Sequence, residues 1–319
     1  MAIVQNWLPP SRENWELVCS VFQYFPLMTV AQWFVDYYPQ GKTSIESRFN
    51  VNGRIGWATM EVVGFITLLY IMYSLPKEVG IEELPWGNWT MAGCFVIHYI
   101  YRAIISPLFL NPSMSPMHIS VWLSGFAFQV LNAISIGGYL AGYGPTSQFE
   151  WAAREEWVFV GLVIWCWGLM GNMFHDDDLR EIRRSADRKQ RKEAKEQGKA
   201  VESVDKIYMI PKNGLFKYSL HAHYLCEWIE WGGWWIIGGW KCHPARTFCS
   251  TRLRRCCHVR CRASDGTRRS LGRKSFKAAR RSFRAWYNGR DQGLGRFGKV
   301  SVATLAEFVM GIQCEATVH

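Results

Sequence analysis

The sequence is organised in long blocks of apolar residues, and these blocks constrain the fold more than any other feature. A block of roughly 18 or more mostly apolar residues is long enough to cross the hydrocarbon core of a bilayer, which is about 30 Å thick. Six such blocks are predicted, at residues 15–38, 56–75, 86–110, 119–143, 157–174 and 215–240. The fold class expected is therefore all-α, a multi-span transmembrane helix bundle of six to seven spans.

The charge is unevenly distributed along the chain. The formal net charge is +11, but residues 241–300 alone contain 18 Lys and Arg against two Asp. The rest of the chain is therefore net negative, and the basic character belongs to the C-terminal tail. A basic pI of this origin is poor evidence for nucleic-acid binding by the whole protein, so no nucleic-acid partner is expected.

The loops between the blocks alternate in charge. The first and fifth loops carry an excess of Lys and Arg, the third region follows Arg102 and has no acidic residue, and the second and fourth loops are acidic. The positive-inside rule places the basic loops in the cytosol. Within the fifth loop, residues 180–200 mix both signs of charge and are interpreted as a solvated helical linker.

Several polar side chains lie inside the apolar blocks or at their ends, where an ionisable group is costly and functional by default. The candidates are Glu61, His98, Tyr99, Arg102, Asn172, His175, Asp176, Glu227 and Glu230. With the orientation above, all of them lie toward the cytosolic half of the bilayer. Each has a simpler alternative: Arg102 can snorkel to the interface, the Asn172 segment can be a helix end, and Glu227 and Glu230 can face solvent.

Glu61 is the hardest of these residues to explain structurally. It stands between Met60 and Val62, about two turns inside its block. A carboxyl group there needs protonation or a hydrogen-bond partner such as Tyr99. A carboxylic acid and a phenol that face the same space can polarise a ketone or enone oxygen.

The chain has no Gly-rich dinucleotide fingerprint after a strand, no phosphate-binding loop and no serine nucleophile elbow. The Cys256-Cys257-His258 segment with Cys261 fits no standard zinc template, and no metal site is predicted. A nucleotide cofactor would therefore have to bind among the helices and the cytosolic loops.

Four segments of the sequence resemble one family of membrane enzymes. The C-terminal segment reads YMIPKNGLFKY at residues 208–218 and then HYLCEWIEW at residues 223–231. Upstream, residues 56–61, 98–102 and 171–183 fit the same pattern. The combination, over residues 41–248, is similar to the steroid 5-alpha-reductase family (3-oxo-5-alpha-steroid 4-dehydrogenases), in particular to its fungal branch.

The resemblance implies an NADPH-dependent oxidoreductase that acts on CH–CH groups in lipid and steroid metabolism. It would be a multi-pass monomer of the endoplasmic reticulum membrane. It would reduce the C4–C5 double bond of a 3-oxo-Δ4-steroid or related enone lipid that enters from the bilayer. Glu61 and Tyr99 would be catalytic and hold the substrate oxygen. The implied cofactor-binding residues are Trp57, Asn111, Asn172, Asp176, Arg183, Tyr208 and Glu227.

The sequence departs from the family pattern at three places. His223 stands where the family usually has Asn, and an Arg expected shortly after Asn111 is replaced by the segment PSMSP. After Phe248 the chain becomes rich in Arg and Cys. We therefore predict a membrane-embedded reductase domain at residues 1–248. Residues 249–319 are interpreted as a basic tail that is disordered or a gene-model artefact.

Three alternatives share much of this pattern. A polyprenol reductase and a very-long-chain enoyl-CoA reductase would use the same helices and NADPH on a different substrate. A non-catalytic membrane protein that retains the reductase scaffold is the third alternative, and the unusual tail is the feature that favours it.

Overall fold

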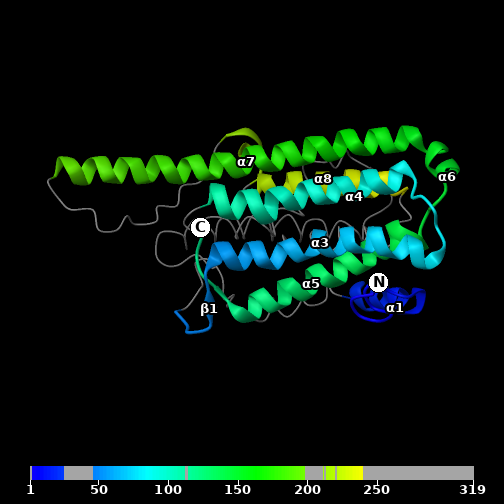
Figure 1. The fold of residues 1–319 in the computed structure, drawn as a ribbon. Coiled ribbons are helices and arrows are strands. Elements are labelled where there is room, and N and C mark those ends of the chain that lie inside the picture. The colour runs from blue at the N-terminus through cyan, green and yellow to red at the C-terminus, as the bar shows by residue number, and fades with distance from the viewer. Residues whose placement is uncertain are drawn as a thin grey trace, which may run out of the picture. The chain divides into compact units, whose positions relative to one another are not determined.

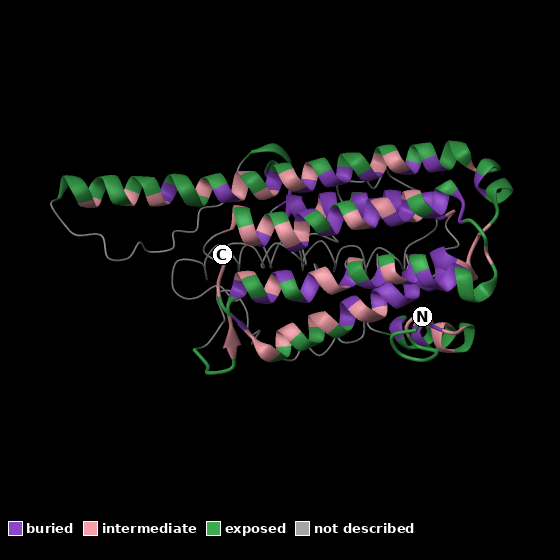
Figure 2. Cartoon of the chain, viewed as in Figure 1, coloured by how far each residue is buried: buried purple, intermediate pink, exposed green. Residues whose placement is uncertain are grey.

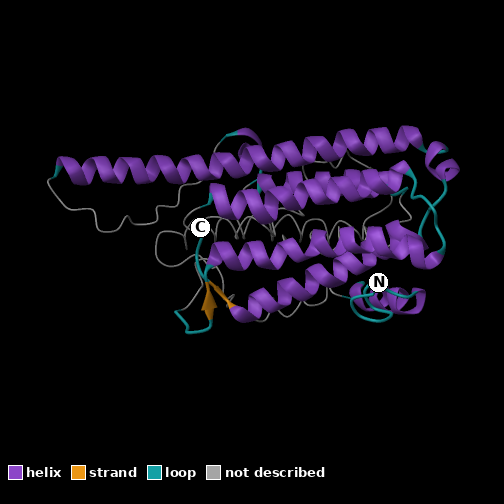
Figure 3. Ribbon diagram, viewed as in Figure 1, coloured by secondary structure: helices purple, strands orange, loops and turns teal. Residues whose placement is uncertain are grey.

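A computed structural model describes residues 2–24, 46–111, 114–197, 211, 213–219 and 221–239 (Figure 1). Nearly all described elements are helices, as predicted (Figure 3). The chain divides into two compact units. The first comprises Met1–Met173 with Cys226–Arg254, and the second comprises Phe174–Leu225 with Arg255–His319.

Four helices in the described part of the chain are long and apolar enough to cross a membrane, by length and composition. They are Gly53–Val79 (α3), Trp86–Leu110 (α4, Trp86–Tyr99, with the π-helical segment η3, Ile100–Leu110), Ile119–Tyr143 (α5, Ile119–Gly138, with η4, Tyr139–Tyr143) and Glu155–Glu196 (α7). They confirm four of the six predicted blocks and define a multi-pass helical protein.

The first and last blocks are less fully described. Helix α1 (Arg12–Phe22) has 11 residues, and residues 25–45, which hold most of the first block, lie outside the described residues. Helix α8 (Ala222–Ile237) has 16 residues, or about 24 Å at 1.5 Å per residue. The sixth block was predicted to begin at Leu215, but that residue lies in a short 3₁₀-helix, η5 (Gly214–Lys217).

A small antiparallel ladder, which the sequence analysis did not predict, brings the beginnings of α3 and α5 together. Strand β1 (Asn50–Val51) pairs with β2 (Met117–His118), and α3 and α5 begin directly after these strands. The two helices therefore start at the same end and lie side by side (Figure 1). Asn52 caps α3 by accepting hydrogen bonds from two backbone N–H groups, those of Arg54 and Ile55.

The core of the first unit is formed by the facing sides of these helices (Figure 2). Aromatic side chains fill much of it, and Trp231 and Trp234 of α8 are almost fully buried. The Trp234 indole N–H donates to the carbonyl oxygen of Met91 on α4, at 2.9 Å. This bond places α8 directly beside α4.

Helices α7 and α8 approach each other through glycines. A Cβ atom at Gly168 would lie 2.2 Å from the backbone nitrogen of Glu230, and one at Gly161 would lie 2.7 Å from the carbonyl oxygen of Gly233. Small residues permit this close approach of helix backbones, which is a common packing mode in membranes.

Two helical segments outside the apolar core are stabilised by local contacts. Helix α6 (Gln148–Ala152) begins with a capping box made by Ser147 and Glu150. The C-terminal part of α7 is mostly exposed (Figure 2) and carries ion pairs one turn apart, such as Arg191–Asp187 and Lys189–Glu193. This part agrees with the predicted charged helical linker.

Candidate functional site

Glu61 and Tyr99, the two predicted catalytic residues, meet at a third side chain. Gln129 of α5 donates from its amide nitrogen to Oε2 of Glu61 on α3 and, at 3.2 Å, to the phenol oxygen of Tyr99 on α4. Glu61 is 5% exposed, Gln129 2% and Tyr99 0%. Three helices thus bring a carboxyl, an amide and a phenol together in an apolar core.

Sequence reasoning missed Gln129, although a signal was present. The residue stands between Phe128 and Val130 in the middle of an apolar block. Among the polar residues predicted as candidates inside the apolar blocks, Asn172 was the only neutral amide. A buried amide faces a similar requirement, because its polar atoms need partners once water is removed.

A second polar cluster lies one residue along α4 from Tyr99. Nδ1 of His98 lies 2.7 Å from Oε1 of Glu230, and its Nε2 lies 3.8 Å from Oε1 of Glu227. Arg102 completes the group, with one guanidinium nitrogen 3.9 Å from Oε2 of Glu227. Both glutamates are buried, which rules out the alternative in which they face solvent.

The two clusters share aromatic neighbours. The Trp231 ring lies 4.7 Å from that of His98 and 6.4 Å from that of Tyr99, measured between centroids. The Phe95 ring, one turn earlier in α4, packs against that of Tyr99 at a centroid distance of 4.6 Å. Aromatic rings therefore fix the orientation of Tyr99 and keep both clusters in a low-dielectric environment.

Trp57 lies at the outer edge of the charged cluster. The Arg102 guanidinium stands 5.5 Å from the centroid of its ring, and 19% of the Arg102 side chain is exposed. A partly exposed guanidinium next to an aromatic ring and a carboxylate has the chemistry to bind a phosphate or a planar cationic ring.

Asn111 and Asn172 were both predicted to bind the cofactor. Asn111 ends η3, and its amide nitrogen donates to the carbonyl and the hydroxyl oxygen of Ser106, at 3.1 and 3.0 Å. It therefore acts as a helix cap in this structure. Asn172 is buried on α7, and its neighbour Gly171 packs closely against Cys226 of α8.

The second unit has its own polar cluster. The backbone N–H of Leu215 donates to Nε2 of His175 at 3.0 Å, and Asn213 donates to Asp178 at 2.9 Å. The His175 ring also lies edge-on to Phe216. These contacts, made by His175 and Asp178, hold the η5 segment against α7.

Three other predicted cofactor residues fall in the second unit. Asp176 is partly buried and Arg183 is exposed. They are seven residues apart on α7, two turns along the same face, or about 10 Å. Tyr208 lies outside the described residues. His223, the departure from the family pattern, is buried, and its ring packs against that of Tyr224 at a centroid distance of 4.1 Å.

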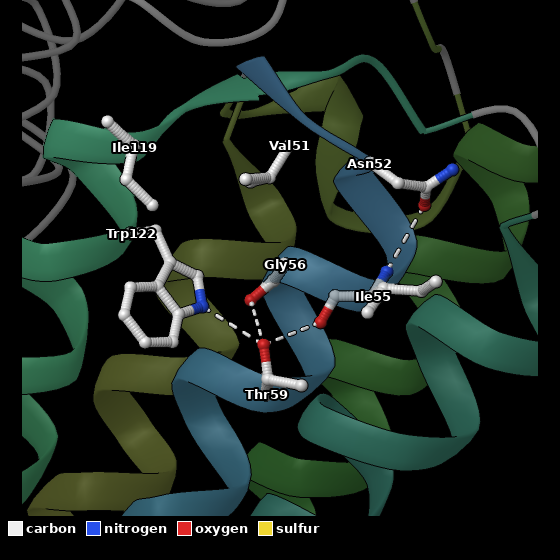
Figure 4. Close-up of a pocket in the computed structure, with 7 residues that line it drawn as sticks. All are labelled: Val51, Asn52, Ile55, Gly56, Thr59, Ile119 and Trp122. Carbon is white, nitrogen blue, oxygen red and sulfur yellow. Dashed lines mark hydrogen bonds between the residues drawn. The ribbon is translucent and has the colours of Figure 1, made fainter. Parts of the chain in front are cut away.

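The structure also has a shallow apolar pocket of about 270 Å³ at the beginning of α3 and α5 (Figure 4). Trp122 donates to the Thr59 hydroxyl at 3.0 Å, and Thr59 donates to the carbonyl oxygen of Ile55 at 2.8 Å. The lining contains none of the predicted site residues. Thr59 therefore faces this pocket, whereas Glu61, two residues later, is buried.

Comparison with known proteins gives consistent matches. The family model for 3-oxo-5-alpha-steroid 4-dehydrogenase matches residues 115–265, a range that ends after Phe248. An uncharacterized protein of Schizosaccharomyces pombe is 34% identical over 220 residues, which cover 65% of this chain and 76% of that protein.

Two named relatives extend the comparison to animals and plants. 3-Oxo-5-alpha-steroid 4-dehydrogenase 1 of Bos taurus is 26% identical over 78% of this chain and 88% of its own length. Steroid 5-alpha-reductase DET2 of Solanum lycopersicum is 29% identical over 67% of this chain and 74% of its own length.

The buried carboxyl–amide–phenol cluster inside a multi-pass helical fold defines a membrane protein with a polar site in its apolar core. The chain belongs to the steroid 5-alpha-reductase family, a family of oxidoreductases, as the sequence analysis predicted.

Proposed function

We propose that the protein reduces the C4–C5 double bond of a 3-oxo-Δ4-steroid or a related enone lipid, with NADPH as the reductant. The observation that carries the proposal is the convergence of Glu61 and Tyr99 on Gln129. These three side chains come from three separate helices and are almost fully buried. Membership in the family supports the same reaction.

Glu61 and Tyr99 would bind the carbonyl oxygen of the enone. A phenol O–H and a protonated carboxyl group both donate hydrogen bonds, and both stabilise the negative charge that develops on this oxygen during reduction. The surrounding aromatic rings exclude water, which strengthens the two hydrogen bonds. When bound, the reduced nicotinamide supplies a hydride to the β-carbon of the enone. The α-carbon would take its hydrogen as a proton from water, which balances the reduction.

The charged cluster would bind part of the cofactor. Its chemistry fits an anionic dinucleotide, because Arg102 is partly exposed and lies beside the Trp57 ring and Glu227. Trp57 would stack on a planar ring, and Glu227 would accept hydrogen bonds from hydroxyl or amide groups. We also assign Asn111, Asn172, Asp176, Arg183 and Tyr208 to cofactor binding, as the family resemblance implies.

The remaining parts of the proposal concern the membrane. We propose six to seven spans, with the four described spans supplemented by α8 and the segment that follows α1. The basic loops would face the cytosol, where NADPH is available, and the lipid would enter from the bilayer. The protein would act as a monomer in the endoplasmic reticulum membrane.

Product analysis tests the proposal. Microsomes that contain the full-length protein would be supplied with NADPH and, separately, with a 3-oxo-Δ4 steroid, a polyprenol and a very-long-chain 2-enoyl-CoA. Mass spectrometry should detect a gain of two hydrogens in the steroid. Glu61→Gln should abolish this turnover while NADPH affinity is retained. Reduction of the polyprenol or the enoyl-CoA alone would reassign the substrate, and no reduction of any lipid would contradict the reductase function.

A further inference from the structure

We infer that Gln129 is a positioning residue that holds Glu61 and Tyr99 in the geometry needed to bind the enone oxygen. The inference rests on the proposed function, because it assigns a role in that site. It concerns a neutral side chain on α5, a helix that contributes none of the predicted site residues.

The first observation is the use of one amide nitrogen for two contacts. An amide nitrogen carries two N–H donors. Gln129 directs them to Oε2 of Glu61 and to the phenol oxygen of Tyr99, the latter at 3.2 Å. A single side chain therefore sets the positions of both proposed catalytic groups, which come from α3 and α4.

The second observation concerns the atoms that the Gln129 amide contacts. Gln129 occupies Oε2 of Glu61, so Oε1 is the carboxyl oxygen that can carry a proton toward a substrate. The phenol oxygen of Tyr99 accepts from Gln129, and its own O–H hydrogen can then be donated to the ketone. We assign these two groups to the ketone oxygen, where a pair of hydrogen bonds would stabilise the developing oxyanion.

The third observation explains how the amide is oriented. The carbonyl end of Gln129 lies against the backbone of α3 at Gly64, where a Cβ atom would come within 2.5 Å of Oε1 and 3.2 Å of Cδ. Gly64 is three residues after Glu61 and faces the same side of α3. The same helix therefore supplies the carboxyl group and the space that directs the amide nitrogen toward it.

A buried amide with a purely structural role would behave differently. A side chain of similar size without hydrogen-bond donors, such as methionine, would fill the same space and retain the packing. The positioning role requires the N–H donors of the Gln129 amide, so Gln129→Met should fold but lose activity. Catalytic groups displaced by about 1 Å lose roughly 100-fold in rate.

The experiment compares Gln129→Met and Gly64→Ala with Gly93→Ala in the full-length protein. A Cβ atom at Gly93 would meet nothing within 4 Å, so this variant controls for glycine replacement within a span. Turnover of progesterone, a simple 3-oxo-Δ4 steroid, would be measured with saturating NADPH, and NADPH affinity would be measured by fluorescence. We expect kcat to fall about 10- to 100-fold in Gln129→Met and measurably in Gly64→Ala. NADPH affinity should stay within about twofold of the wild type, and Gly93→Ala should behave as the wild type.

Wild-type kcat in Gln129→Met would overturn the inference and leave the proposed function intact, provided that Glu61→Gln is inactive in the same assay. If the wild-type protein does not reduce progesterone, the proposed steroid reaction fails, and the inference is tested without turnover. Thermal unfolding of Gln129→Met, Tyr99→Phe and the double variant forms a double-mutant cycle. A midpoint shift of the double variant that is smaller than the sum of the two single-variant shifts supports the shared contact. A shift equal to that sum overturns it.

Discussion

Nδ1 of His98 lies 2.7 Å from Oε1 of Glu230, and this contact joins α4 to α8 inside the apolar core. His98 is 2% exposed and Glu230 is 0% exposed. Removal of one partner from a buried hydrogen-bonded pair of ionisable groups costs about 3 kcal/mol, because the other group keeps its desolvation penalty. We therefore expect His98→Leu to destabilise the protein by roughly 3 kcal/mol.

Thermal unfolding in detergent micelles would measure this effect. The double variant His98→Leu/Glu230→Leu should regain much of the lost stability, because two apolar side chains can replace a buried pair at little cost. A double variant that is less stable than either single variant would contradict this account of the contact.

Glu227 offers a direct test of the cofactor assignment. Its carboxyl group lies 3.9 Å from Arg102 and 3.8 Å from His98. Glu227→Gln keeps the shape of the side chain but removes its charge. A hydrogen bond to a charged group is worth about 1.5–3 kcal/mol, so NADPH affinity should fall about 10- to 100-fold. Fluorescence titration with NADPH would measure the change, and unchanged affinity would remove Glu227 from the cofactor site.

Much of the architecture was predictable from the sequence, because a membrane span has a strong and local signal. Helices α3 and α5 and the α4–η3 helix follow their apolar blocks closely. Other features depend on tertiary contacts that no local pattern encodes. The β1–β2 ladder has two residues in each strand, which is too short for a detectable alternation. The π-helical η3 segment directly after Tyr99 was not predicted either.

The candidate site was predictable in part for the same reason. Glu61 stood out because a carboxyl group in an apolar block needs a partner, and Tyr99 was proposed as that partner. The structure joins the two through Gln129, and that link depends on the register of α5 against α3. Asn111 has a role in the structure that the sequence analysis did not consider, because its amide caps η3.

Asn88 provides a test of stability away from the proposed site. This buried residue accepts from the Trp151 indole at 2.6 Å and donates to the carbonyl oxygens of Leu140 and Pro145, at 2.6 and 2.9 Å. Asn88→Ala leaves several buried polar groups without their partner. Each such group costs about 1–3 kcal/mol, so a clear fall in the thermal unfolding midpoint is expected.

Thr90→Ala is the matched control for Asn88. Its hydroxyl donates only to the backbone oxygen of Trp86 within the same helix, and the contact is exposed. The control should leave the unfolding midpoint nearly unchanged. Equal midpoints for the two variants would contradict a structural role for the Asn88 amide.

The stability of the exposed part of α7 should depend on pH through Glu181. Hydrogen bonds from Arg188 and Ser185 hold the pKa of the Glu181 carboxyl below its usual value of 4.5. Because the folded-state pKa is lowered, the contact stabilises the helix above the ordinary pKa and is lost as the pH falls through the lowered value. Amide hydrogen exchange at residues 180–196 should therefore be faster in Glu181→Gln than in the wild type at neutral pH. The difference should shrink as the pH falls below 4.5 and disappear below the lowered pKa, and a difference that persists there would have another cause.

Gly168 tests whether the close approach of α7 and α8 positions the charged cluster. A Cβ atom at this position would lie 2.2 Å from the backbone nitrogen of Glu230, so the backbone of α8 must move. Overpacking of this kind typically costs about 1–3 kcal/mol. Because α8 carries Glu227 and Glu230, Gly168→Ala should lower both the unfolding midpoint and NADPH affinity. Gly93→Ala, whose added methyl group meets nothing within 4 Å, should change neither. A stable Gly168→Ala variant with wild-type NADPH affinity would show that the cluster does not depend on this contact.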